Sequence, residues 1–196
     1  MIGILDYGMG NLASVERAFR HLGASVRVQD HLEGIDKLVI PGVGAFAKAM
    51  EQIKPLKPEI QKWASSGQPL MGICLGEQLL FETSEELQET VGLEILPGRV
   101  RYFEPTPGIK IPHMGWNTLD VTSGSKAMSG VQPGDQVYFV HSLYVEASDP
   151  QIVAATSVHG TKFVAAVEAG SVWGTQFHPE KSGEVGLNIL NNFILC

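Results

Sequence analysis

The sequence predicts an α/β fold with a mostly parallel central sheet, helices on both faces of that sheet, and an added β-rich segment. In the first half of the chain, apolar strand-like runs alternate with segments of helical period, which is the order of βαβ units. After Arg99 the apolar runs become short and lie between Gly, Pro and Asp turns, as is typical of strands joined by tight turns. A length of 196 residues with 44% hydrophobic composition suits a single enzyme or binding domain over residues 1–196.

The first half supplies its strands and helices in alternation. A strand over 2–6 precedes a helix that Asn11 should cap and Gly23 should end, with an apolar face of Leu12, Val15, Phe19 and Leu22. Short strands follow over 25–28 and 37–40, and then a helix begins near Phe46 and is disturbed by Pro55 and Pro58. A buried strand over 69–74 leads directly into a helix over 75–82.

The second half is rich in predicted strands. These cover 99–103, 109–112, 136–141, 144–147, 152–156, 162–168 and 171–178. The intervening EPTPG segment reads as a rigid surface connection, because apolar strands resume at once. A final helix over about 183–195 returns to the helical period.

The composition argues against several classes of partner. A formal charge of -7 with no run of Lys and Arg disfavours nucleic acid and anionic membranes. The N-terminus lacks the basic start and cleavage site of a signal peptide, and no apolar run reaches the length of a membrane span. We therefore expect a cytoplasmic protein.

The two cysteines, Cys74 and Cys196, form neither a disulfide framework nor a zinc motif. The chain also has no P-loop and no dinucleotide fingerprint, so we expect no metal and no cofactor.

Cys74 stands in a pattern that suits a nucleophile. Gly72-Ile73-Cys74-Leu75-Gly76 matches the G-x-nucleophile-x-G turn between a strand and a helix, where glycines let the backbone bend sharply. A helix N-terminus would stabilise the thiolate form of Cys74. The alternative is a small buried side chain at a tight packing point, which is where most free cysteines lie.

His178 is the best candidate for the base that such a nucleophile needs. The segment WGTQFHPEKS puts it at the end of an apolar strand, with Glu180 two residues later. That carboxylate could fix the imidazole tautomer and stabilise its protonated form. Taken alone, HPE would be better explained as a surface turn with an incidental ion pair. Together with the glycine-flanked turn at Cys74, the HPE segment favours a triad of Cys74, His178 and Glu180.

The loop PGVGAF offers an oxyanion site. Gly42 and Gly44 free the backbone to aim the Val43 N–H inward, and the amide of Leu75 follows the nucleophile directly. A plain strand-ending turn would also contain such glycines.

These residues resemble a known family. GICLGEQLLFE with FHPEKS is similar to the class I, triad-type glutamine amidotransferases. Within that family, DYGMGNL, VIPGVGAF, PHMGWN and YFVHSLYV resemble the glutaminase subunits of imidazole glycerol phosphate synthase, over essentially the entire chain. The resemblance implies a flavodoxin-like glutaminase in which Cys74 attacks the amide carbon and His178 passes a proton to the departing ammonia.

The resemblance also implies a set of glutamine-binding positions. These are Gly42 and Gly44 in the loop, Gln78 four residues after Cys74, and the segment Ser142, Leu143 and Tyr144. The chain departs from the pattern at Glu77, where relatives often carry Met. We expect Glu77 to face away from the site and to complement the helix dipole.

The acceptor for ammonia should lie on another chain, since the sequence ends soon after the triad. In the family the partner is a (β/α)8-barrel cyclase, which makes a heterodimer with the glutaminase. The resemblance implies that Asn11, Trp116, Tyr138 and Lys181 line the docking face or the ammonia gate. For Trp116 the alternative is a core aromatic, and for Lys181 a solvated charge.

Other functions on the same scaffold remain open from the sequence. One is the glutaminase of pyridoxal phosphate synthase, although such relatives carry a GGES-like segment where this chain has GVGA. Others are a free-standing cysteine hydrolase and a catalytically inactive binding module in which the turn around Cys74 serves only packing.

Overall fold

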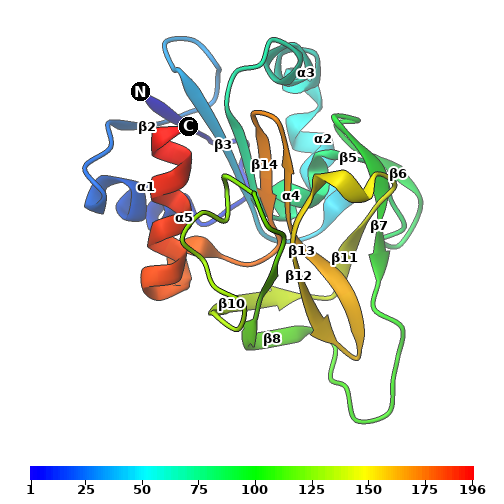
Figure 1. The fold of residues 1–196 in the computed structure, drawn as a ribbon. Coiled ribbons are helices and arrows are strands. Elements are labelled where there is room, and N and C mark those ends of the chain that lie inside the picture. The colour runs from blue at the N-terminus through cyan, green and yellow to red at the C-terminus, as the bar shows by residue number, and fades with distance from the viewer.

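A computed structural model describes residues 1–196, and its centre is an eight-stranded sheet (Figure 1). Five parallel strands are followed by three antiparallel ones. In spatial order the strands are β2 (Val26–Gln29), β1 (Ile2–Leu5), β3 (Lys37–Gly42), β4 (Leu70–Cys74), β14 (Val172–Thr175), β13 (Thr161–Ala169), β12 (Val153–His159) and β9 (Asp120–Val121). This confirms the predicted α/β class with its mostly parallel sheet.

Helices cover both faces of this sheet, and each face has its own apolar core. On one face lie α1 (Leu12–His21) and α5 (Gly183–Leu195), whose Phe19 and Phe193 rings are 6.3 Å apart (Figure 1). On the other lie α2 (Phe46–Ile53), α3 (Lys57–Ser65) and the short α4 (Leu75–Leu79). The break between α2 and α3 is a 3₁₀ turn over Lys54–Leu56, where the prolines were expected to disturb the helix.

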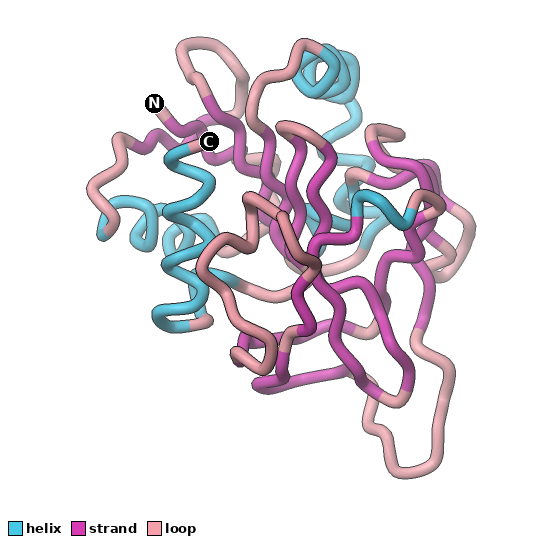
Figure 2. The backbone as a smooth tube through the Cα atoms, in the orientation of Figure 1, coloured by secondary structure: helices cyan, strands magenta, loops and turns pink.

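The β-rich segment supplies the antiparallel strands of the central sheet and most of two smaller sheets beside it (Figure 2). One has the order β11 (Leu143–Ala147), β7 (Leu96–Tyr102), β5 (Phe81–Ser84) and β6 (Thr90–Val91). The other pairs β10 (Gln136–His141) with β8 (His113–Thr118) in antiparallel register. A long loop joins β7 to β8 and contains the cis peptide bond Ile111–Pro112.

Several expected boundaries were wrong. The helix after Cys74 stops at Leu79, because the carbonyls of 79–81 accept hydrogen bonds from the backbone of 93–96 instead of continuing the helical ladder. The segment 109–112 is loop rather than strand, and β14 ends at Thr175, before His178. Asn11 occupies the N-cap position of α1 but its side chain makes no capping hydrogen bond.

No helix is both long and apolar enough to cross a membrane.

Candidate active site

Cys74 sits at a sharp turn from the end of β4 into α4. Its backbone angles are φ 56° and ψ −112°, a conformation that side-chain-bearing residues rarely adopt and that is typical of functional sites. A Cβ added at Gly76 would lie 1.8 Å from the carbonyl oxygen of Ile40, and one at Gly72 would lie 2.5 Å from that of Gly76. Both glycines are therefore needed for α4 to pack this close to β3 and β4.

The thiol of Cys74 borders a cavity of about 310 Å³. The residue is 6% exposed, so the sulfur is sheltered but reachable from the cavity. The side-chain amide of Gln176 lies 3.7 Å from the sulfur, and the carbonyl oxygen of Val140 lies 3.9 Å from it. A small ligand in this cavity would meet the sulfur directly.

His178 and Glu180 form a buried pair beside this turn. His178 Nδ1 is 2.8 Å from Glu180 Oε1, and the two side chains are only 2% and 1% exposed. The carbonyl of Tyr138 accepts a hydrogen bond from the His178 N–H, and the Ser182 hydroxyl donates to the His178 carbonyl at 2.6 Å. The backbone of His178 is thus held on both sides, and its ring is held at Nδ1 by Glu180, while its Nε2 atom has no hydrogen-bond partner.

The electrostatics of His178 favour its charged form. Burial works against the imidazolium, but interactions with the Cys74 sulfur and the Glu180 carboxylate outweigh this and raise the pKa of His178 to about 9. No hydrogen bond joins the Cys74 sulfur to His178 Nε2, but the contribution of Cys74 to the raised pKa of His178 is consistent with the ion pair that a cysteine nucleophile and its base require.

The glycine loop after β3 borders the same cavity. Gly42 pairs in register with Cys74, while Val43 and Gly44 line the cavity and Val43 is 41% exposed. Gly44 has φ +104°, which favours glycine over any other residue. Leu75, whose amide directly follows the nucleophile, also lines the cavity.

The remaining walls come from α4, β10 and the start of β11. Gln78, Ser142 and Leu143 line the cavity, whereas Gly42 and Tyr144 do not. The Tyr144 ring instead packs on Phe103 with 4.8 Å between centroids. Gln78 donates hydrogen bonds to Leu143 O and to Gln176 Oε1, so its side-chain amide links α4 to two other segments next to the cavity.

Glu86 is a cavity residue that the sequence did not predict. It is the one acidic side chain in the lining, and its carboxylate accepts a hydrogen bond from the backbone N–H of Phe46, the first residue of α2. Several glutamates lie between positions 82 and 94, and nothing in their spacing singles out Glu86.

Two neutral histidines stand at the cavity wall: His141 lines the cavity and His113 does not. His141 Nδ1 donates to the carbonyl of Leu143 at 2.6 Å, so its Nε2 accepts from His113 Nδ1 at 3.0 Å. The amide of Asn117 lies 3.2 Å from the remaining ring nitrogen of His113. Burial is the main cause that lowers the pKa of His113 to about 4 and that of His141 to about 3, so this chain of hydrogen bonds has one direction.

Glu77 does not line the cavity, in line with the expectation that it faces away from the site, but it does not lie on an exposed face of its helix. Its side chain is fully buried instead of facing solvent, and neither carboxylate oxygen has a hydrogen-bond partner. Because α4 packs against the sheet, its third residue points inward, and Glu77 Cγ lies 2.7 Å from where a Cβ of Gly174 would be. Burial, with a smaller contribution from the nearby Cys74 charge, raises the pKa of Glu77 well above its usual range.

The four residues expected at a docking face lie on separate elements. Trp116 on β8 is 56% exposed, and its ring meets the half-buried Tyr138 on β10 edge-on with 6.2 Å between centroids. Asn11 precedes α1, and Lys181 is exposed on the 3₁₀ turn Pro179–Lys181. Trp116 is therefore not the core aromatic considered as its alternative.

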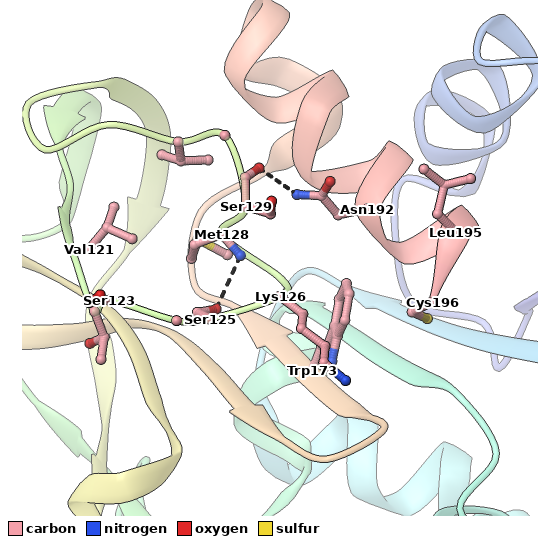
Figure 3. Close-up of a pocket in the computed structure, with 14 residues that line it drawn as sticks. Val121, Ser123, Ser125, Lys126, Met128, Ser129, Trp173, Asn192, Leu195 and Cys196 are labelled. Carbon is pink, nitrogen blue, oxygen red and sulfur yellow. Dashed lines mark hydrogen bonds between the residues drawn. The ribbon is translucent and has the colours of Figure 1, made fainter.

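A larger cavity of about 600 Å³ lies away from Cys74, between the loop 121–131 and α5 (Figure 3). Its polar groups already bond to one another: Asn192 donates to the carbonyl of Ser129, and the Met128 N–H donates to the Ser125 hydroxyl. Nowhere do three or more His, Cys, Asp or Glu side chains come together in a way that could hold a metal ion.

Comparison with known proteins gives a consistent result. A sequence model of the class-I glutamine amidotransferases matches residues 3–196. The chain is 49% identical to the imidazole glycerol phosphate synthase subunit HisH of Syntrophotalea carbinolica, over 98% of both chains. It is 44% identical to the protein of the same name from Methanosarcina barkeri, over 98% of this chain and 97% of that one.

Solved structures agree at the level of the fold. A crystal structure of a glutamine amidotransferase superimposes with a TM-score of 0.75 at 21% identity, covering 98% of each chain. The structure of PurLQS from Thermotoga maritima gives a TM-score of 0.72 at 20% identity, covering 99% of this chain and 97% of that one.

Proposed function

This chain belongs to the class-I glutamine amidotransferase family and is the glutaminase subunit of an imidazole glycerol phosphate synthase, and we propose that Cys74, His178 and Glu180 are its catalytic triad. The observation that supports the triad is the buried His178–Glu180 pair, in which Nδ1 and Oε1 are 2.8 Å apart. Cys74 would supply the nucleophile, His178 the base and Glu180 the orienting carboxylate that covalent acyl transfer needs.

The proposed reaction uses these groups in order. The Cys74 thiolate attacks the side-chain amide carbon of glutamine, and the carbonyl oxygen gains a negative charge. The N–H groups of Val43 and Leu75 stabilise that oxyanion. The imidazolium of His178 gives its proton to the nitrogen, the C–N bond breaks, and ammonia leaves a thioester on Cys74. His178 then takes a proton from water, which attacks the thioester and releases glutamate.

The cavity suits glutamine in size and charge. A volume of about 310 Å³ is at the small end of ligand pockets, as a single amino acid requires. Glu86 can pair with the α-ammonium group, and the backbone of Ser142 and Leu143 can bond the polar groups of the substrate. We assign Gly42 and Gly44 to shaping the loop, and Gln78 to bracing the wall. Tyr144 supports the wall only through the residues next to it.

The glycine loop also suggests how the enzyme is regulated. If the peptide between Gly42 and Val43 must rotate before the Val43 N–H reaches the oxyanion, the isolated glutaminase is a poor enzyme that its partner activates. Glycine on each side of Val43 permits such a rotation, and Gly44 already has φ +104°.

We propose that ammonia passes to a (β/α)8-barrel cyclase bound as a heterodimer. The names of the relatives support a multi-subunit synthase, since each is a synthase subunit. The cyclase would use ammonia and a phosphoribulosyl formimino aminoimidazole carboxamide ribonucleotide to form imidazole glycerol phosphate and an aminoimidazole carboxamide ribonucleotide. Trp116, Tyr138, Asn11 and Lys181 are the proposed contacts with the cyclase or its ammonia gate, with Trp116 as the exposed aromatic anchor.

We further propose that residues 1–196 act as one amidotransferase domain in the cytoplasm. The family match over residues 3–196 supports the first point. The second is supported by the reactive free thiol on which the mechanism depends, because a reducing compartment protects it.

Glutamate release tests this function. The wild type and Cys74→Ala are assayed, each alone and with the cyclase and its nucleotide. The wild type should be activated by the partner, and Cys74→Ala should be inactive in every mixture. Equal turnover in the two proteins would refute the triad, and a wild type unaffected by partner and nucleotide would refute the regulation.

A further inference from the structure

Tyr7 is a buried residue next to the active site to which the mechanism assigns no role. It lies in the loop between β1 and α1, and it is 6% exposed. Its hydroxyl donates a hydrogen bond to the carbonyl oxygen of Pro41 at 2.8 Å. Pro41 is the second-last residue of β3, so this bond holds the strand end from which the loop with Val43 and Gly44 leaves.

The Tyr7 phenol also lies close to Gly42, which pairs with Cys74 across neighbouring strands. A Cβ added at Gly42 would be 2.7 Å from the Tyr7 hydroxyl, 2.8 Å from Leu75 Cβ and 2.9 Å from the N–H nitrogen of Gly76. Gly42 is therefore enclosed between Tyr7 and the start of α4, in register with Cys74. Burial, with a further contribution from the Cys74 charge, raises the pKa of Tyr7, so the hydroxyl keeps its proton and remains a donor.

The far end of the loop is held as well. The Glu86 carboxylate accepts a hydrogen bond from the N–H of Phe46, where α2 begins. With Pro41 and Phe46 both bonded, backbone rotation is restricted to residues 42–45, which include the proposed oxyanion donor Val43. A loop held at both ends samples fewer conformations, so it loses less conformational entropy when it adopts the reactive conformation.

We infer that Tyr7 is a positioning residue for amide hydrolysis, acting through Pro41 to hold the loop that carries the Val43 N–H. The inference rests on the proposed function. An oxyanion donor acts only once charge develops in the transition state. Loss of the Tyr7 hydroxyl should therefore lower kcat and leave KM for glutamine nearly unchanged.

Tyr7→Phe tests this, because it removes one oxygen atom and keeps the ring that fills the core. Glutamate release is measured in the complex with cyclase and its nucleotide. Ser66→Ala is the matched control, since it removes a hydroxyl that donates to the backbone carbonyl of Trp63 at the end of α3. We expect kcat of Tyr7→Phe to fall about 3- to 10-fold, less than the roughly 10²–10³ of losing an oxyanion donor outright, with KM within about twofold.

Labelling of Cys74 by iodoacetamide separates positioning of the loop from damage to the nucleophile. Alkylation forms no oxyanion, so its rate at Cys74 should match the wild type, as read by mass spectrometry of the Cys74 peptide to exclude Cys196. Thermal unfolding establishes a temperature at which both proteins are folded. Unchanged kcat, a defect in KM alone, or slowed alkylation in Tyr7→Phe would each overturn the inference. A wild type that releases no glutamate would instead overturn the proposed function.

Discussion

The backbone N–H of His178 donates a hydrogen bond to the carbonyl oxygen of Tyr138, with 3.0 Å between nitrogen and oxygen. The Tyr138 N–H in turn donates to the hydroxyl of Ser182, which donates to the carbonyl of His178. On its other side the Tyr138 ring contacts the exposed Trp116. A single residue of β10 therefore joins the proposed docking aromatic to the proposed catalytic base, and movement at the docking face has a short route to the triad.

Replacing Trp116 should weaken docking more than it affects folding. Its side chain is 56% exposed in the isolated chain, and exposed aromatic side chains are common anchors of interfaces. We expect Trp116→Ala to lose at least about 2 kcal/mol of binding, or about 30-fold in Kd, by titration calorimetry with the cyclase. Leu195→Ala is the control, because Leu195 is 76% exposed at the end of α5. Equal affinities of Trp116→Ala and wild type would exclude Trp116 as an anchor.

Glu180 should contribute to the alkaline limit of activity. Cys74 and Glu180 raise the pKa of His178 to about 9 from an unfolded value of about 6.5. The stability that the charged imidazole contributes is therefore fully present below about pH 6.5 and is lost as pH rises through about 9. Above that pH the neutral imidazole has no proton for the departing ammonia, and kcat should fall. In Glu180→Gln the pKa of His178 drops, so this decline moves to lower pH and kcat at neutral pH falls at least about 10-fold.

The measurement is the pH profile of glutamate release, with Glu184→Gln as control. Glu184 is an exposed acid in the first turn of α5, and its loss should leave the profile unchanged. An alkaline limit at the same pH in Glu180→Gln and the wild type would contradict the assigned role.

Much of the fold could be predicted because many of its elements depend on residues that are close together in the sequence. The glycines around Cys74 encode a turn that is visible within one short motif, and the helical period of 183–195 matches α5 as observed. The helix over 75–82 was predicted too long because its end is set by hydrogen bonds from residues 93–96. β8 was missed for a related reason. Its strand conformation depends on hydrogen bonds to β10, which follows later in the chain.

The site shows the same division between local and distant constraints. The spacing of His178 and Glu180 predicts their contact, since two residues on one turn can reach each other. By contrast, Glu86 reaches the cavity only because β5 carries it past α2, and the His113–His141 contact depends on the pairing of two strands. Glu77 was misjudged because helix position alone does not say which side of α4 faces the sheet.

The neutral histidine pair should make the fold sensitive to acid. The pKa values of His113 and His141 are lowered to about 4 and about 3, whereas the unfolded chain takes up protons near pH 6.5. Stability should therefore fall as pH decreases from about 6.5 toward about 4, by up to about 1.4 kcal/mol per pH unit for each histidine. Replacing both by Phe should flatten this slope.

Urea unfolding at several pH values between about 4.5 and about 7 measures the slope. The control is His21→Asn, which changes an exposed histidine on α1 and should keep the wild-type slope. If the double Phe variant loses stability with acid as steeply as the wild type, other groups dominate the acid response.

Glu77 should reduce the stability of the fold at neutral pH. A buried carboxyl group without hydrogen bonds favours its protonated form, so the folded chain binds a proton that the unfolded chain has released. Folding therefore carries no ionisation penalty from this group below its unfolded pKa of about 4.3, and the penalty grows as pH rises above that value. Glu77→Gln keeps the shape of the side chain but cannot ionise, so it should remove this pH dependence.

We expect Glu77→Gln to be more stable than the wild type at about pH 8 by at least about 1 kcal/mol, and nearly equal to it at about pH 4. Glu77→Met, which also removes the unpaired polar atoms, should be more stable at both pH values, provided that its side chain fits beside Gly174. Thermal unfolding across this pH range measures both variants, with the exposed Glu59→Gln on α3 as control. A Glu77→Gln protein whose stability parallels that of the wild type at every pH would mean that Glu77 is ionised in the fold. The α4 helix would then have to shift to give its carboxylate a partner, because none of the surrounding groups reaches either oxygen in the present arrangement.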